Sequence, residues 1–146
     1  AYARDLISLG RADLMLVGGV EALSQPLLSA LDVAAPEVIP GEGAAVLILE
    51  AADHALSHGR APLAELAGAI CLAPGAPGAA AAALAQAGLA EADLVRAPAA
   101  CGHTFGAAVA LAAACCVGKL VGGQPGPLAA ATQDDSAAVV FREWTA

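Results

Sequence analysis

The sequence predicts an α/β fold of layered type, in which helices are buried against mixed sheets, and it predicts one domain over residues 1–146. First, short apolar runs bounded by glycine and proline alternate along the chain with helical patterns. Second, hydrophobic residues make up 59% of the chain and charged residues 14%, which excludes a disordered tail or a polar linker. Third, 42 alanines and 16 glycines bury little area each, so we expect helices and strands to pack closely.

A helix and a strand are expected in the first twenty residues. Residues 3–9 have an amphipathic helical pattern, and Gly10 stands where a left-handed helix terminator belongs. Residues 13–17 (DLMLV) form a short apolar run that is closed by Gly18-Gly19. A run of this length between turn signals is typical of a strand buried on both faces, as in a parallel or mixed sheet covered by helices.

The next segment is expected to contain a helix, a second strand and a further short helix. Residues 21–31 favour a helix, although we expect Pro26 to interrupt it. The apolar run at 44–50 (AAVLILE) predicts the second strand, and a short helix follows at 53–57.

The remaining elements continue the alternation of strands and helices. A mixed strand pattern spans 62–72, and a hinge of proline and glycine at 73–78 separates it from an alanine-rich helix at 79–87. Another strand is expected to begin at Leu94, and the last strand candidate is 137–142 (AAVVFR).

The longest helical candidate is 105–120, which is rich in alanine and nearly devoid of charge. A helix without a polar face must be surrounded by protein on almost every side. We therefore expect a central helix, with the strands at 13–17 and 44–49 in the layers next to it.

The charge balance excludes several classes of partner. The chain has a net charge of −8 and one lysine, whereas a nucleic-acid or anionic membrane surface requires clustered basic side chains. The two long uncharged stretches, 66–90 and 97–118, are dominated by alanine and glycine, and the first is broken by prolines, so no membrane span is expected. Because no signal peptide is seen, we expect the protein in the cytoplasm.

The four cysteines are expected to be structural. Cys71, Cys101, Cys115 and Cys116 show no C-x-x-C spacing and have no histidine at ligand spacing. Such cysteines most often behave as small buried hydrophobes. The sequence therefore predicts neither a metal site nor a bound cofactor.

Two glycine-containing segments carry a carboxylate. Gly18-Gly19 indicates either a turn or a close approach of another backbone, and Glu21 beside it is placed to cap a helix that follows. In Gly41-Glu42-Gly43, a carboxylate stands between two permissive residues ahead of a strand. If Glu42 is buried, it needs hydrogen-bond donors or a cation, and we favour a structural carboxylate bonded by backbone amides over a catalytic one.

His103 is the candidate for chemistry. It lies between Gly102 and Thr104, just ahead of the predicted central helix. The positive end of a helix dipole favours the neutral imidazole, which can donate a hydrogen bond. A histidine held only by backbone groups is the alternative interpretation.

Three segments, in their order along the chain, resemble the β-ketoacyl synthases of the thiolase superfamily. The segment DLMLVGGVEA resembles the family's strand and Gly-Gly-x-Glu turn. PGEGAAVLILE, followed by DHALSHGR, resembles its Gly-Glu-Gly strand and the helix behind that strand. CGHTFGAA resembles the segment that carries its second active-site histidine. The resemblance implies a thiolase-like layered fold, of which residues 1–146 form an incomplete, ketosynthase-like domain. The residues that it marks as shaping the site are Gly18, Gly19, Glu21, Gly41, Glu42, Gly43 and Phe105.

The chemistry that the resemblance implies is a decarboxylative Claisen condensation between an acyl-cysteine and a malonyl-carrier thioester. This reaction requires a thiolate, an oxyanion site and two histidines. Only His103 matches that set, because no cysteine stands at the nucleophile's position and the segment of the first histidine is absent. Pro98 replaces the family's lysine, and residues 132–135 (TQDD) replace its glycine-rich loop.

Three hypotheses follow. The first is a non-catalytic subunit, similar to chain-length factors of type II polyketide or fatty acid systems, which forms a heterodimer with a ketosynthase and shapes its acyl tunnel. An acyl carrier protein with its acyl or malonyl thioester is a further partner that this hypothesis allows. The second is a portion of an active β-ketoacyl synthase, so the status as an acyltransferase stays open. The third is a structural or interaction protein on a decayed thiolase fold.

Overall fold

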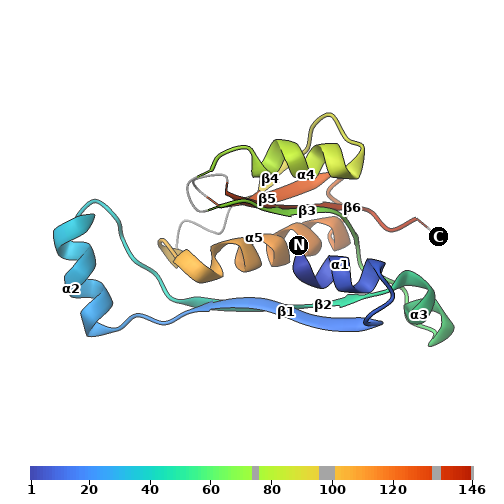
Figure 1. The fold of residues 1–146 in the computed structure, drawn as a ribbon, viewed down its shortest axis with the longest axis horizontal. Coiled ribbons are helices and arrows are strands. Elements are labelled where there is room, and N and C mark those ends of the chain that lie inside the picture. Colours follow the sequence, from blue (N-terminus) through green and yellow to red (C-terminus); the bar gives the residue numbers. More distant parts are fainter. Residues whose placement is uncertain (74–75, 96–100, 133–135, 146) are drawn as a thin grey trace.

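Two β-sheets lie on either side of helix α5 (Ala108–Val121) in the computed structural model, which describes residues 1–73, 76–95, 101–132 and 136–145 (Figure 1). One sheet is an antiparallel pair, formed by β1 (Leu14–Glu21) and β2 (Gly43–Glu50). The other has four strands in the order β3-β6-β5-β4, with β4 parallel to β5 and the other pairs antiparallel. Its strands are β3 (Glu65–Cys71), β4 (Asp93–Val95), β5 (Leu128–Ala131) and β6 (Ala137–Arg142). The predicted α/β class, with mixed sheets and buried helices, is confirmed.

The other helices occupy three different places around these layers. The outer side of the four-stranded sheet is covered by α4 (Ala79–Ala87), which contacts β3, β5 and β6. On the inner side of the strand pair lies α1 (Tyr2–Ser8), which contacts β1 and β2, whereas α2 (Gln25–Ala34) and α3 (Ala52–Ser57) lie at opposite ends of that pair (Figure 1). None of the helices in the described part of the chain is both long and apolar enough to cross a membrane.

Small side chains let α5 contact both sheets, as predicted for the central helix. Its buried positions are Ala112, Ala113, Cys116 and Leu120. Toward the four-stranded sheet they form one core cluster with Val95, Leu128, Ala130 and Phe141. A short 3₁₀ helix, η2 (Phe105–Ala107), precedes α5, so the predicted helix at 105–120 is present with a tighter first turn.

The alanine-rich helix α4 packs against the sheet in the same way. Two residues of α4, Ala79 and Ala83, are completely buried against the sheet, in a cluster with Ala129, Ala138 and Val140. A Cβ at Gly68 of β3 would overlap the carbonyl oxygen of Ala83, so the helix backbone lies almost directly on the strand. The expectation of close packing from the alanine and glycine content is confirmed here.

The strand predicted at 13–17 is longer than expected and is exposed on one face. Gly18-Gly19 does not end the strand, because both glycines belong to β1 and pair with Val46 and Ala45 of β2. Exposure alternates along β1, whose inner face packs on α5, while its outer face leaves large apolar side chains in solvent. The prediction of burial on both faces was therefore wrong: the described helices cover this pair on one side. The exposed side chains of its outer face are Leu14, Leu16, Val20, Val46 and Ile48.

The helix predicted at 21–31 begins and ends later than expected. Glu21 still belongs to β1, and α2 starts at Gln25 with Ser24 as its N-cap. Pro26 lies in the first turn of α2 and does not interrupt it. A proline is tolerated there because the first N–H groups of a helix have no intrahelical acceptor.

Candidate functional site

His103 is held through its main chain by the segment that leads into β2. Its N–H donates to the carbonyl oxygen of Ile39 at 2.8 Å, and its own carbonyl accepts from the N–H of Gly41 at 3.0 Å. His103 and Pro40 thereby form an isolated parallel bridge. The backbone of the histidine is fixed at the point where β2 and the helical layer meet.

The imidazole of His103 is oriented by the residues that follow it. Its Nδ1 accepts a hydrogen bond from the main-chain N–H of Phe105 at 3.2 Å, and the two rings lie 4.2 Å apart. An Nδ1 that accepts carries no proton, so the neutral imidazole has its proton on Nε2. Phe105 has a backbone φ of 30°, which residues other than glycine rarely adopt. Such strained backbone conformations are found mostly at functional sites. The geometry thus supports His103 as a hydrogen-bond donor through Nε2.

Two of the predicted glycines, Gly41 and Gly19, make room for the segment around His103, and a third, Gly43, makes room for a side chain of α5. A Cβ on Gly41 would overlap the carbonyl oxygen of Cys101, and one on Gly19 would overlap that of Gly106. A Cβ on Gly43 would lie 2.9 Å from Cδ1 of Leu111. The close approach predicted as one alternative for Gly18-Gly19 therefore holds for both glycines, since a Cβ on Gly18 would lie 2.5 Å from the carbonyl oxygen of Ala45, while the predicted turn does not form.

Both predicted carboxylates accept main-chain N–H groups at this site. Glu21 accepts from Gly106 at 3.2 Å, and Glu42 accepts from Leu23 at 2.7 Å. Glu42 is thus bonded by a backbone amide, as predicted, but its side chain is exposed and not buried. Glu21 binds the start of the central helical segment, although we expected it to cap the helix that follows in sequence.

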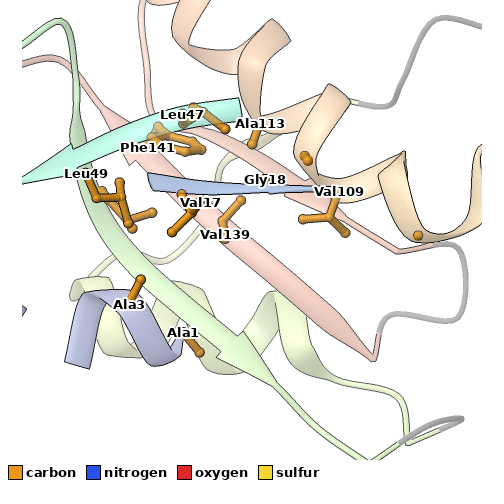
Figure 2. A pocket seen from close by; sticks show the side chains of 13 residues that line it. Ala1, Ala3, Val17, Gly18, Leu47, Leu49, Val109, Ala113, Val139 and Phe141 are labelled. Atoms are coloured by element: carbon orange, nitrogen blue, oxygen red, sulfur yellow. The ribbon is translucent and has the colours of Figure 1, made fainter. Parts of the chain in front are cut away.

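An apolar pocket of about 260 Å³ lies between the two sheets, with α1 at one side and α5 at the other (Figure 2). Gly18 and Gly106 line it, so the pocket borders the His103 segment, but His103 does not line it. The residues that line it carry only apolar side chains or none, and no cysteine is among them. The pocket can take an apolar group and offers no nucleophile. The other lining residues are Ala1, Ala3, Val17, Leu47, Leu49, Leu66, Val109, Ala110, Ala113, Val139 and Phe141.

Thr104 is a residue of the site that the sequence did not mark. Its side chain is 2% exposed, and its Oγ1 has no hydrogen-bond partner among the described residues. Its only signal in the sequence is its place between His103 and Phe105. A threonine in a run of small residues gives no indication that it is buried.

The cysteines behave differently from one another. Cys71 is exposed, Cys101 and Cys115 are half-buried, and only Cys116 is buried as predicted. Burial raises the pKa of the Cys116 thiol to about 12, which makes it unreactive.

Two of the sequence departures lie where the structure gives no description. Pro98, which stands at the family's lysine position, is outside the described residues. The same holds for 133–135 in the segment that replaces the glycine-rich loop.

A sequence relative and solved structures indicate which known proteins this chain resembles. No protein-family model matches the chain. One curated relative, Nodulation protein E of Rhizobium leguminosarum bv. trifolii, is 43% identical over 83 residues, which is 47% of this chain and 21% of the relative.

Solved structures match nearly the whole chain. A β-ketoacyl synthase from Burkholderia phymatum STM815 superposes with a TM-score of 0.79 at 22% identity, covering 99% of this chain and 58% of that one. The ishigamide ketosynthase/chain length factor superposes with a TM-score of 0.77 at 20% identity, covering 99% and 57%. The chain thus spans little more than half the length of these structures. The predicted resemblance to the β-ketoacyl synthases is therefore confirmed at the level of the fold, and the chain has the fold of a part of these structures.

Proposed function

We propose that the chain is a ketosynthase-like, non-catalytic partner of a β-ketoacyl synthase in polyketide or fatty acid chain elongation. The observation that carries this proposal is an oriented imidazole beside an apolar pocket whose described lining contains no thiol. His103 presents a donor at Nε2, whereas the neighbouring pocket is lined without a cysteine. An imidazole without a nucleophile cannot form the acyl-enzyme intermediate that the condensation requires.

Partnership with a ketosynthase has a precedent among the fold relatives, since one of them is a ketosynthase/chain length factor. An apolar pocket beside the His103 segment suits a subunit that borders an acyl chain. An acyl carrier protein is the second proposed partner, and the cytoplasm is the proposed location. The net charge of −8 disfavours broad contact with an acidic carrier protein, so any such contact would be local.

The second candidate function is that of a portion of an active β-ketoacyl synthase. The observation that favours it is the tautomer of His103, because an Nε2–H donor is what polarising a malonyl thioester carbonyl requires. In that case the nucleophilic cysteine and the first histidine belong to polypeptide outside these 146 residues.

The two functions are separated by a binding and a decarboxylation experiment. The chain is mixed with a type II ketosynthase, and complex formation is measured by size-exclusion chromatography with light scattering. We expect a 1:1 complex that forms equally with His103→Ala and with Ser29→Ala, an exposed control on α2. A chain that stays monomeric beside the ketosynthase contradicts the partner proposal.

Carbon dioxide release from a malonyl-carrier thioester tests the second candidate. The non-catalytic proposal predicts that the chain alone releases no more than the background rate. Release by the chain alone that depends on His103 would instead support the active synthase.

A further inference from the structure

We propose that His54 and His58 form a two-histidine binding site for a divalent transition-metal ion such as Zn²⁺. The site lies on α3, which follows β2, whereas the His103 segment contacts the residues just before β2. The two sites are therefore at opposite ends of this strand, and the inference is independent of the proposed function.

The spacing and the rings bring the two imidazoles together. His54 lies in α3 and His58 is its C-cap, four residues on, which places both side chains on one face of the helix. The ring centroids are 4.4 Å apart with an angle of 40° between the planes. His58 is exposed and His54 half-buried, so an ion from solvent can reach both.

Both Nδ1 atoms are occupied by oxygen acceptors, which leaves the Nε2 atoms for a ligand. His54 Nδ1 donates to Oε1 of Glu50 at 2.6 Å, and His58 Nδ1 donates to the carbonyl oxygen of His54 at 2.8 Å. In the neutral imidazoles, Nε2 then carries a lone pair. Metal-binding histidines in proteins are held in this way, by a carboxylate or a backbone carbonyl on the other nitrogen.

The surroundings of the pair suit a cation. Glu50 is held in place by Arg60, whose guanidinium binds both carboxylate oxygens. Asp53 accepts from the main-chain N–H of His54 at 2.9 Å, so two carboxylates and one guanidinium lie next to the imidazoles. Within the described ranges no cluster of three or more His, Cys, Asp or Glu is placed to hold a metal, so water would complete the coordination. Imidazole nitrogens favour Zn²⁺, Cu²⁺ and Ni²⁺ over Mg²⁺ or Ca²⁺.

The test is a Zn²⁺ titration of the chain by isothermal calorimetry. Because free thiols are also zinc ligands, the measurement compares wild type with His54→Ala/His58→Ala, in which the four cysteines are unchanged. We expect the wild type to bind one more equivalent than the double variant, and His103→Ala, which removes the third imidazole, to bind as the wild type does. Equal stoichiometry and affinity in wild type and double variant would overturn the proposal.

A second pair of variants tests the role of Glu50. Glu50→Ala is expected to weaken zinc binding by about 10–100-fold, the usual effect of losing a carboxylate behind a histidine ligand. Arg60→Gln keeps that carboxylate and is expected to bind at least as tightly as the wild type. Nitrogen NMR of the imidazoles gives a direct readout: zinc should shift the Nε2 signals of His54 and His58, and unshifted signals would contradict the site. Circular dichroism checks that each variant is folded.

Discussion

Gly41 is the position at which a single added methyl group meets the most rigid obstacle. A Cβ there would overlap the carbonyl oxygen of Cys101, and the Gly41 N–H is itself hydrogen-bonded to the carbonyl oxygen of His103. We expect Gly41→Ala to lower the free energy of unfolding by about 1–3 kcal/mol, the usual cost of overpacking. Urea denaturation followed by circular dichroism measures this change.

The matched control is Gly118→Ala on α5. A Cβ at Gly118 would meet nothing within 4 Å, and the residue lies inside a helix. Alanine should raise the free energy of unfolding there by about 0.5–1 kcal/mol, because it restricts the unfolded chain and favours the helix. Equal effects of the two substitutions would show that the contact at Gly41 is not the cause.

The thiols of Cys116 and Cys71 are expected to differ in reactivity. Burial raises the pKa of Cys116 to about 12, so almost none of it is thiolate at pH 8.5, whereas Cys71 is exposed. Iodoacetamide at pH 8.5 should label Cys71 within minutes and leave Cys116 unlabelled until urea unfolds the chain. Peptide mass spectrometry identifies the labelled residue, and early labelling of Cys116 would contradict its burial.

The raised pKa also fixes the sign of a pH effect on stability. A thiol whose pKa is higher in the folded state binds its proton more tightly there. Its contribution is complete below the pKa of the unfolded thiol, near 8.5, and falls as the pH rises toward about 12. The urea midpoint of the wild type should therefore fall between pH 8 and pH 10 by more than that of Cys116→Ala.

At the scale of elements, α2 is a helix that depends on local interactions. None of its residues is buried, and its first turn is closed by the Ser24 hydroxyl, which accepts from the N–H of Leu27. Ser24→Ala should therefore destabilise the helix by about 0.5–2 kcal/mol. Hydrogen exchange of the Leu27 and Leu28 amides is expected to accelerate, while the global urea midpoint stays the same.

Ser29→Ala is the control within the same helix. Ser29 is exposed in the middle of α2, where alanine is the better helix former. In Ser29→Ala, the amides of α2 should exchange more slowly than in the wild type. A fall in the global midpoint for Ser24→Ala would mean that α2 is coupled to the core, contrary to its lack of buried residues.

At the scale of the whole molecule, the outer face of the β1–β2 pair is the largest departure from a closed layered fold. Leu16 and Ile48 stand opposite each other and are 67% and 64% exposed. Exposed apolar patches bind hydrophobic dyes and promote association. We expect the chain to bind anilinonaphthalene sulfonate, and Leu16→Lys/Ile48→Lys to reduce that fluorescence several-fold without loss of secondary structure.

Val33→Lys provides the comparison for added charge alone. Val33 is 85% exposed and belongs to α2, a helix that lies beyond one end of the strand pair (Figure 1), so its substitution should leave dye binding unchanged. If Val33→Lys lowers the fluorescence as much as the double variant does, net charge and not the sheet face governs dye binding.

The sequence by itself determined the close packing, the candidate imidazole and the order of the elements except for β5 (Leu128–Ala131), which was not predicted. Alternating apolar runs and helical patterns depend on neighbouring residues, so β2, α4 and the central helix were predictable within a few positions. The small side chains of α4 and α5 also indicated that these helices lie close to the sheets. The interruption at Pro26 was wrong because Ser24, two residues earlier, already begins the helix.

Only the tertiary structure decided what the predicted site residues do. Glu21 caps a helical segment 85 residues later in the sequence, and Gly19 and Gly41 receive the backbone of the His103 segment. It also decided that β1 has one exposed face, since the sequence shows a run of apolar residues but not which layer covers it. These outcomes depend on how separate layers are brought together, and a local pattern carries no record of its distant neighbour.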